Sequence, residues 1–156
     1  MDWKTKVVTG TKAEETLALF LYSSLLGIPP ILLEFVFGFS VPRIAGITLL
    51  YNGLKYSVSW LGCLRFLRIK AHAVCSEISN VSLRLSVAEG LAQAIFSTSV
   101  FSASAILVGV EIDRVARIAV WYTASPFFFG RMFPVTLILV QELKSWLKSQ
   151  GWQVRF

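Results

Sequence analysis

The sequence predicts an all-α membrane protein with four transmembrane helices. Three observations lead to this prediction: 55% of the 156 residues are hydrophobic, only 15% are charged, and the mean hydropathy is +0.66. Soluble domains carry about a quarter charged residues. The apolar residues also fall in runs that are long enough to cross a bilayer. A soluble hydrophobic core is therefore a poor explanation of this composition.

The four candidate spans are residues 16–38, 44–66, 86–110 and 116–140. Each span must be helical because the backbone has no hydrogen-bonding partner in lipid. The links at 39–43 and 111–115 are short, so each joins two spans into a helical hairpin. A longer polar loop at 67–85 joins the two hairpins.

We expect one membrane domain over residues 1–156. It consists of a first repeat at 13–66, a cytoplasmic loop at 67–85, a second repeat at 86–140 and an interfacial C-terminal tail at 141–156. The tail has Leu143, Trp146 and Leu147 at helical spacing, which predicts an extension of the fourth helix along the membrane surface. A frayed helix end with aromatic anchors explains the same pattern.

The formal net charge is +6, and the basic residues lie outside the spans more often than within them. They occur in the N-terminal tail, around the central loop and in the C-terminal tail: Lys4, Lys6, Lys12, Arg65, Arg68, Lys70, Arg84, Lys144, Lys148 and Arg155. Cytoplasmic segments carry an excess of Lys and Arg. Both termini and the central loop are therefore predicted on the cytoplasmic side of an inner membrane. No basic stripe alternates with aromatic residues, so we do not expect nucleic acid as a partner.

The two hairpins resemble each other. The sequence VPRIA at 41–45 recurs as VARIA at 115–119, and the same offset of 74 places Glu15 on Glu89. Each repeat has an even number of spans, so both repeats have the same orientation, related by a pseudo-two-fold axis along the membrane normal. This parallel internal repeat predicts that Glu15 and Glu89 lie together at the cytoplasmic mouths of the first and third helices.

Several residues within the spans are unfavourable in lipid. Lys55 lies near the middle of the second span, and Arg131 lies in the cytoplasmic half of the fourth. A charge at the bilayer centre costs at least about 2.5 kcal/mol, so Lys55 should face protein or water. Ion pairs and snorkelling side chains are the structural alternative to a functional role, for these cations and for the acidic residues near the membrane alike.

Helix breakers accompany these charges. Pro29-Pro30 interrupts the first span, while Pro126 and Pro134 flank Gly130 in the fourth. Proline inside a helix removes a hydrogen bond, and such breaks often mark the binding sites of transporters. A packing kink explains them equally well. The third span is rich in small and hydroxyl residues, which fit close helix packing. Alternatively, the hydroxyl and amide groups of Gln93–Ser97 and Thr98–Ser102 line a polar path.

Metal and enzyme chemistry are not indicated. Cys63 is expected in a span, Cys75 is expected as a reduced thiol in the loop, and His72 is the single histidine. These residues do not have metal-ligand spacing, and no nucleophile–base pair or phosphate loop is present. The sequence therefore predicts a protein that is not an enzyme, with no catalytic residues, no metal and no cofactor.

Two span openings carry a family resemblance. ETLA at 15–18, followed by YSS at 22–24, resembles the opening of the first span in bacterial L-alanine exporters of the AlaE type, and AEGLA at 88–92 resembles their third span. The short turn at 38–40 and the aromatic fourth helix around Gly130 also fit. The resemblance implies export of L-alanine or a related small neutral amino acid, driven by the proton gradient as in an antiporter.

The resemblance extends over residues 13–142, and it has departures. The family has aspartate where this chain has glutamate at 15 and 89. Its second helix carries a Pro-Tyr-Gly element, whereas this chain has WLG at 60–62, and Lys55 has no counterpart. These departures concern the substrate more than the fold.

A zwitterionic substrate needs a cation for its carboxylate and an acid or carbonyl groups for its ammonium. We expect Lys55 and Arg131 to bind the carboxylate. Glu15 and Glu89 are expected to bind the ammonium or the coupling proton, as burial favours the protonated carboxyl. The further residues expected to line the substrate site are Pro29, Pro126 and Ser97.

Four helices are too few to enclose a substrate pathway, so we expect a homodimer or larger homo-oligomer. The alternatives to an exporter are a small-ion or small-solute channel, which would favour rings of like charge, and a non-transporting membrane assembly or regulatory subunit. Flux that is insensitive to uncouplers would indicate the channel. Function in liposomes without partners would exclude the assembly subunit.

Overall fold

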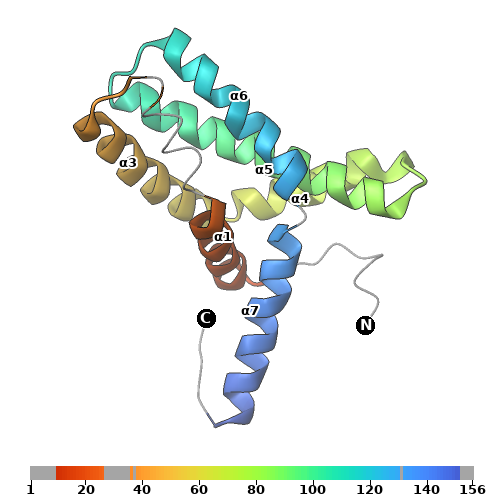
Figure 1. Cartoon of the computed structure of the whole chain (residues 1–156). Helices are drawn as coiled ribbons and strands as arrows, with labels where there is room; N and C mark the ends of the chain where they lie inside the picture. The colour runs from red at the N-terminus through yellow and green to blue at the C-terminus, as the bar shows by residue number, and fades with distance from the viewer. Residues whose placement is uncertain (1–9, 27–35, 37, 131, 152–156) are drawn as a thin grey trace.

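The computed structural model describes residues 10–26, 36, 38–130 and 132–151, and these residues are all-helical. Six α-helices and one 3-10 turn follow one another along this part of the chain (Figure 1). They are α1 (Lys12–Leu26), α3 (Val41–Trp60), α4 (Cys63–Val74), η1 (Cys75–Glu77), α5 (Val81–Leu107), α6 (Ile112–Phe129) and α7 (Met132–Ser149). The prediction of an all-α fold is confirmed.

Helix α5 is the centre of the molecule. Asn80 caps its first turn, where the Asn80 side chain accepts a hydrogen bond from the backbone N–H of Leu83 at 3.1 Å. The helix ends before Gly109, whose φ of 80° is in the left-handed region that glycine adopts without a steric penalty. The predicted third span therefore corresponds to a helix. Helix α3 runs beside the second half of α5, and α4 lies beside its first half (Figure 1). Helix α6 runs along α5 as far back as Gly90.

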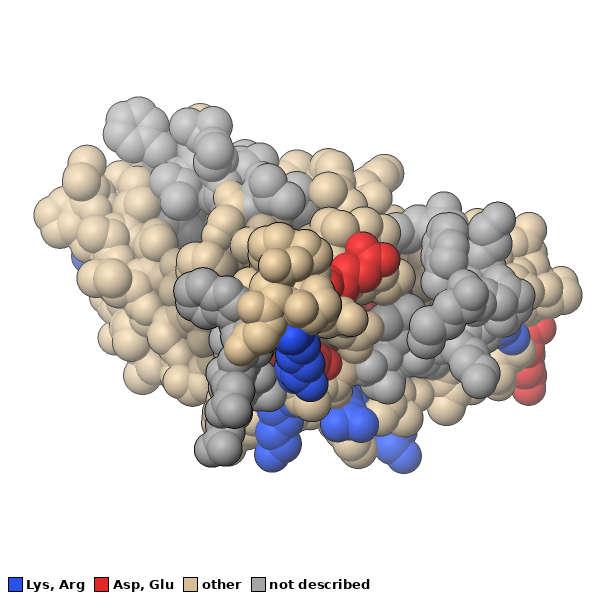
Figure 2. All heavy atoms as spheres, turned by 90° about the horizontal axis from the view of Figure 1, so that it is seen from below, with Lys and Arg blue, Asp and Glu red and all other residues tan. Residues whose placement is uncertain are grey.

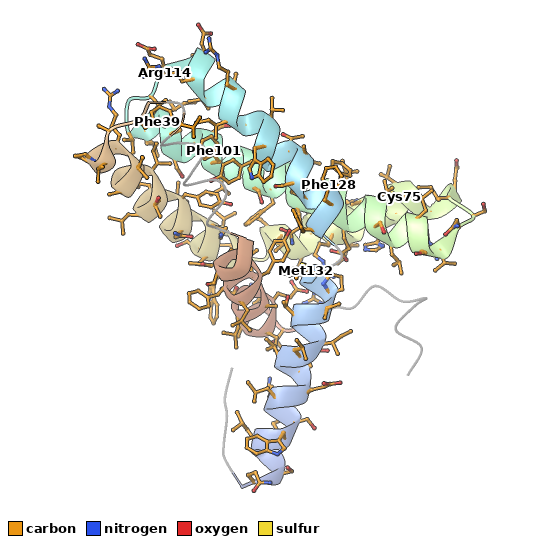
Figure 3. All side chains as sticks on the ribbon, in the orientation of Figure 1. Phe39, Cys75, Phe101, Arg114, Phe128 and Met132 are labelled. Carbon is orange, nitrogen blue, oxygen red and sulfur yellow. The ribbon has the colours of Figure 1, made fainter. Side chains whose placement is uncertain are left out.

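By length and composition, α5 is the one helix in the described part of the chain that is able to cross a membrane by itself. Helices α6 and α7 meet the same criterion when they are taken together, and their axes differ by 62°. The predicted interruption near Gly130 is therefore present. Pro126 remains inside α6, and Figure 3 shows Phe128 and Met132 on the two sides of the break.

The prediction of a single helix over residues 44–66 was wrong, because two helices divide this range. Helix α3 ends at Trp60, and Gly62 adopts a φ of 93° before α4 begins at Cys63. The central loop predicted at 67–85 was wrong for the same reason, because α4, η1 and the start of α5 occupy most of it. Polar residues suggested a loop there, but α4 is an amphipathic helix that buries Leu64, Arg68 and Ala71.

The environment of Cys75 differs from the predicted loop. Cys63 lies exposed at the start of α4, and Cys75 is buried. Cys75 packs with Ala71, Ala88 and Ala92 where α4 returns against α5. The small alanine side chains allow this close approach of the two helices.

Two hydrophobic clusters hold the helices together. One cluster joins α3, α5 and α6, and at its centre Phe101 stacks on Tyr122 with ring centroids 4.2 Å apart. Figure 3 shows Phe101 between these helices, with Phe39 nearby. The other cluster joins α1, α4, α5 and α7 through side chains that include Leu19, Leu64, Phe96 and Phe133. The second cluster surrounds the charged site described below.

Helix α7 packs against α1 and then extends away from the other helices (Figure 1). Its continuation to Ser149 confirms that residues 141–149 of the predicted tail are helical. The ammonium of Lys144 lies 2.6 Å from a carboxylate oxygen of Glu14, which ties the two helices. The Thr11 N–H also donates to Glu14, at 3.0 Å.

We predict that low pH loosens this contact. Burial raises the pKa of Glu14, but the bonds from Lys144 and Thr11 outweigh burial and hold that pKa below its ordinary value. A lowered pKa stabilises the folded state above the unfolded-state pKa, and this stabilisation is lost as the pH falls through the folded-state pKa. Amide protection factors in α7 should therefore decrease below about pH 4. An equal decrease in a Lys144→Met variant would contradict this assignment.

Candidate functional site: a buried cluster of charged side chains

Arg68 lies at the centre of a buried charged cluster that we define as Glu15, Arg68, His72 and Glu89. Arg68 is fully buried, although the sequence placed it in a cytoplasmic loop. Its position on the buried face of α4, four residues after Leu64, turns the guanidinium toward α5. Arginine is almost never fully buried unless it is paired, so the surroundings of Arg68 must supply acceptors.

Glu89 of α5 is the main partner of Arg68. The guanidinium Nε donates to Glu89 Oε2 at 2.8 Å, and Nη2 donates to Oε1 at 2.8 Å. This bidentate arrangement is the strong geometry for an arginine–carboxylate pair. It fixes α4 against α5 in one register.

Glu15 of α1 is the second acid at this arginine. The Arg68 Nη1 lies 3.4 Å from Glu15 Oε1, and the Gly10 N–H donates to the same oxygen at 3.2 Å. The predicted meeting of Glu15 and Glu89 is confirmed, with Arg68 as the group that joins them. Ile44 and Ile118, which the predicted repeat relates, both belong to the hydrophobic cluster of α3, α5 and α6.

His72 and Phe133 complete the surroundings. His72 follows Arg68 by one helical turn, and its Nε2 lies 2.9 Å from Glu89 Oε1. The ring of Phe133 from α7 lies under the Arg68 guanidinium, with 4.8 Å between Cζ and the ring centroid. A cation over an aromatic face gains further stabilisation. Three helices therefore supply the cluster, and a fourth, α7, supplies the aromatic ring against it.

The charges of the cluster do not balance when His72 is neutral. Two carboxylates and one guanidinium leave one negative charge, and one bound proton, on His72 or on a carboxylate, neutralises it. Isolated buried charge is costly. The cluster is therefore a chemically plausible place to bind and release one proton.

Lys55 is buried in α3, as expected for a cation that faces protein. Its ammonium lies 4.5 Å from the ring centroid of Tyr51 and 5.3 Å from that of Tyr56. The Tyr56 hydroxyl lies 3.1 Å from the Ser23 hydroxyl of α1. Aromatic faces solvate the ammonium without neutralising its charge. The part of the chain that the structure describes places no carboxylate within ion-pairing distance of Lys55.

The other predicted site residues are dispersed. Ser97 is half-buried on α5, two turns beyond Glu89, and Pro126 is buried in α6. Pro29 and Arg131 lie outside the described residues. The described site thus brings Glu15 and Glu89 together, and it places Lys55 in a separate aromatic environment on α3.

Helices α5 and α6 cross closely beside Glu89. A Cβ atom on Gly90 would lie 2.9 Å from Phe127 Cδ1 and 3.1 Å from Phe127 Cα. A Cβ atom on Gly130 would lie 3.0 Å from the backbone nitrogen of Gly90 and would overlap the carbonyl oxygen of Pro126. The two glycines therefore allow the backbone at the α6–α7 break to lie directly against the helix that carries Glu89.

Sequence reasoning missed the roles of Arg68 and His72. The sequence pattern that could have revealed them is the helical spacing of Leu64, Arg68 and Ala71, which places Arg68 on the apolar face of α4. Arg65 and Lys70 fall on the exposed side of the same helix. A charged residue on the apolar side of a helix usually has a buried partner.

The fold and the site together define a class: a helical protein, with one helix that is able to cross a membrane, that buries an acid–arginine–acid–histidine cluster between its helices. Comparisons with protein-family models, with curated proteins and with solved structures find no match for this chain.

Proposed function

We propose that this chain is a multi-pass inner-membrane exporter of L-alanine or a related small neutral amino acid, driven by the proton gradient. The observation that carries the proposal is the buried cluster in which Arg68 joins Glu89 and Glu15. Such a group of titratable residues at a helix junction is able to couple the binding of one proton to a rearrangement of the helices.

The surface of the protein supports the membrane part of this proposal. Large apolar side chains are more than half exposed on five helices, α3 to α7, and they include Leu49, Phe66, Leu107, Val120 and Leu139. Exposed apolar surface of this extent is typical of contact with lipid or with another protein. Figure 2 shows a face on which uncharged side chains predominate and Lys and Arg gather along one edge. Four spans and cytoplasmic termini remain part of the proposal.

The proposed transport cycle uses the two carboxylates and Lys55 differently. Protonation of Glu89 weakens its bond with Arg68, because a neutral carboxyl attracts the guanidinium less strongly than a carboxylate does. Helices α4 and α5 are then free to separate. Lys55 and Arg131 attract the substrate carboxylate, and Glu15 accepts the ammonium when Arg68 has moved. Pro29, Pro126 and Ser97 line the route, and a second copy of the chain completes its wall.

Efflux from proteoliposomes tests this proposal. Vesicles that contain the purified protein and labelled L-alanine should lose label when a proton gradient is imposed, and an uncoupler should stop the loss. We expect Glu89→Gln to reduce the gradient-driven efflux to the level of protein-free vesicles. Glu111→Gln removes a carboxylate that is 77% exposed and should leave the rate unchanged.

Each outcome has a definite meaning. If vesicles with the wild-type protein still lose L-alanine in the presence of the uncoupler, the protein is a channel. This result would overturn the proposal of a proton-driven exporter. Absence of any alanine efflux from wild-type vesicles would overturn the proposed function. A wild-type rate for Glu89→Gln would exclude Glu89 as the proton site.

A further inference from the structure

Gln93 is a buried polar side chain that the cluster does not use. It lies on α5 one turn beyond Glu89, and it is fully buried. Neither its amide nitrogen nor its amide oxygen has a hydrogen-bond partner in the part of the chain that the structure describes. Native proteins rarely leave a buried amide unpaired at both atoms, since the loss of hydration is not compensated. Such a group therefore indicates an absent partner.

The position of Gln93 shows where that partner would lie. Glu89, Gln93, Phe96 and Val100 share one face of α5, because residues three and four apart are neighbours on a helix. Phe96 and Val100 belong to the hydrophobic cluster between α1, α4, α5 and α7. Gln93 therefore faces the interior of the helix assembly, directly above the charged cluster.

The register of α3 places polar groups near the same level. Gly46 lies against Val108, and Tyr51 packs on Phe101, so α3 and α5 are antiparallel. If this register continues, Ser59 of α3 lies at the level of Gln93. Lys55 lies one turn of α3 before Ser59, on the side of Gln93 that is remote from Glu89. Ser59 is buried, and its hydroxyl lies 3.4 Å from that of Thr16 in α1.

Residues of opposite charge lie on the two sides of Gln93 along the helix axis. The acidic residue Glu89 lies one turn before Gln93 on α5, and the cationic Lys55 lies about one turn away in the opposite direction on α3. A primary amide presents a donor and an acceptor side by side. An α-amino acid presents an acceptor and a donor, its carboxylate and its ammonium, on the same carbon atom.

We propose that the Gln93 amide recognises the α-amino acid group of the exported substrate. Its Nε2–H donates to the carboxylate on the side of Lys55, and its Oε1 accepts from the ammonium on the side of Glu89. This inference rests on the proposed function and specifies its substrate class: compounds that carry both charges on one carbon bind. Amines or acids that carry only one of them bind at most weakly.

Ligand-induced thermal stabilisation of the full chain in detergent tests the inference. L-alanine should raise the melting temperature of the wild-type protein. Gln93→Leu removes both polar atoms at similar volume, so the unliganded variant should be at least as stable as wild type while its apparent affinity for L-alanine falls at least about tenfold. Gln150→Leu makes the same change at an exposed position and should behave as wild type.

A set of ligands provides a test that does not depend on any variant. Propionate and ethylamine each lack one half of the zwitterion, and neither should stabilise the wild-type protein at concentrations where L-alanine does. Equal stabilisation by either compound would overturn recognition through Gln93. Wild-type affinity in Gln93→Leu would also overturn it.

These outcomes separate the inference from the proposed function. Gln93→Leu vesicles that export L-alanine as wild type does would reject only the role of Gln93. Wild-type vesicles without alanine efflux would reject the proposed function, and the inference with it.

Discussion

Replacing Arg68 by methionine is expected to lower the free energy of unfolding by about 3–5 kcal/mol. The variant leaves Glu15 and Glu89 buried and close together without the guanidinium between them. Methionine fills much of the same volume, so the expected loss comes mainly from unpaired charge. The interaction of Arg68 with Phe133 is lost as well.

The measurement is denaturation of the purified protein in detergent, followed by circular dichroism. Arg65→Met is the matched control, since Arg65 lies in the same helix with its side chain exposed. Its unfolding free energy should change by less than about 1 kcal/mol. Arg68→Lys should fall between the two, because a lysine ammonium keeps the charge but not the bidentate geometry.

A combined variant tests whether unpaired charge causes the loss of stability in Arg68→Met. Arg68→Met together with Glu15→Gln and Glu89→Gln removes every formal charge from the three groups. Its stability should recover a large part of the loss, because neutral amides cost less to bury than unpaired carboxylates. A combined variant that is as unstable as Arg68→Met alone would show that packing, and not charge, determines the effect.

Gly130→Ala is expected to destabilise the protein by about 1–3 kcal/mol or more. The new Cβ atom would overlap the carbonyl oxygen of Pro126 and approach the backbone of Gly90 to 3.0–3.1 Å. Both neighbours are backbone atoms, so no side chain is able to rotate away. The α6–α7 break must shift away from α5, and Phe133, which lies directly after the break, moves away from Arg68.

Gly53→Ala is the matched control for this prediction. Gly53 lies inside α3, and nothing is within 4 Å of the position of its Cβ. The substitution should stabilise the protein by up to about 1 kcal/mol, because alanine favours the helix. The melting temperatures of the two variants should therefore move in opposite directions. An unchanged melting temperature for Gly130→Ala would contradict the close contact of α5 with the break.

The predictions from the sequence were most accurate where a local pattern is sufficient. Long apolar runs predicted the all-helical fold and the position of α5. Pro126 and Gly130 predicted the interruption of the last long helix, because proline and glycine act on the backbone where they occur. The offset of 74 predicted the meeting of Glu15 with Glu89, since repeated segments pack in equivalent ways. The expected burial of Lys55 follows from its position within an apolar run.

The predictions failed where a residue's surroundings come from other helices. The polar residues of 67–85 suggested a loop, and that assignment hid α4 and treated Arg68 as a solvated charge. A short amphipathic helix and a basic loop differ little in composition, and they are distinguished by what packs against the apolar face. Arg68 is buried because Glu89, Glu15 and Phe133 arrive from three other helices.

The sequence by itself determined the helical class, the most apolar helix, the break at Gly130 and the pairing of the two glutamates. The tertiary structure decided that Arg68 and His72 join those glutamates and that Gln93 faces the interior without a partner. The physical reason is that helix formation depends on neighbours within a few residues. A buried charge or amide depends on partners distant in the chain, which only the packing of the helices brings together.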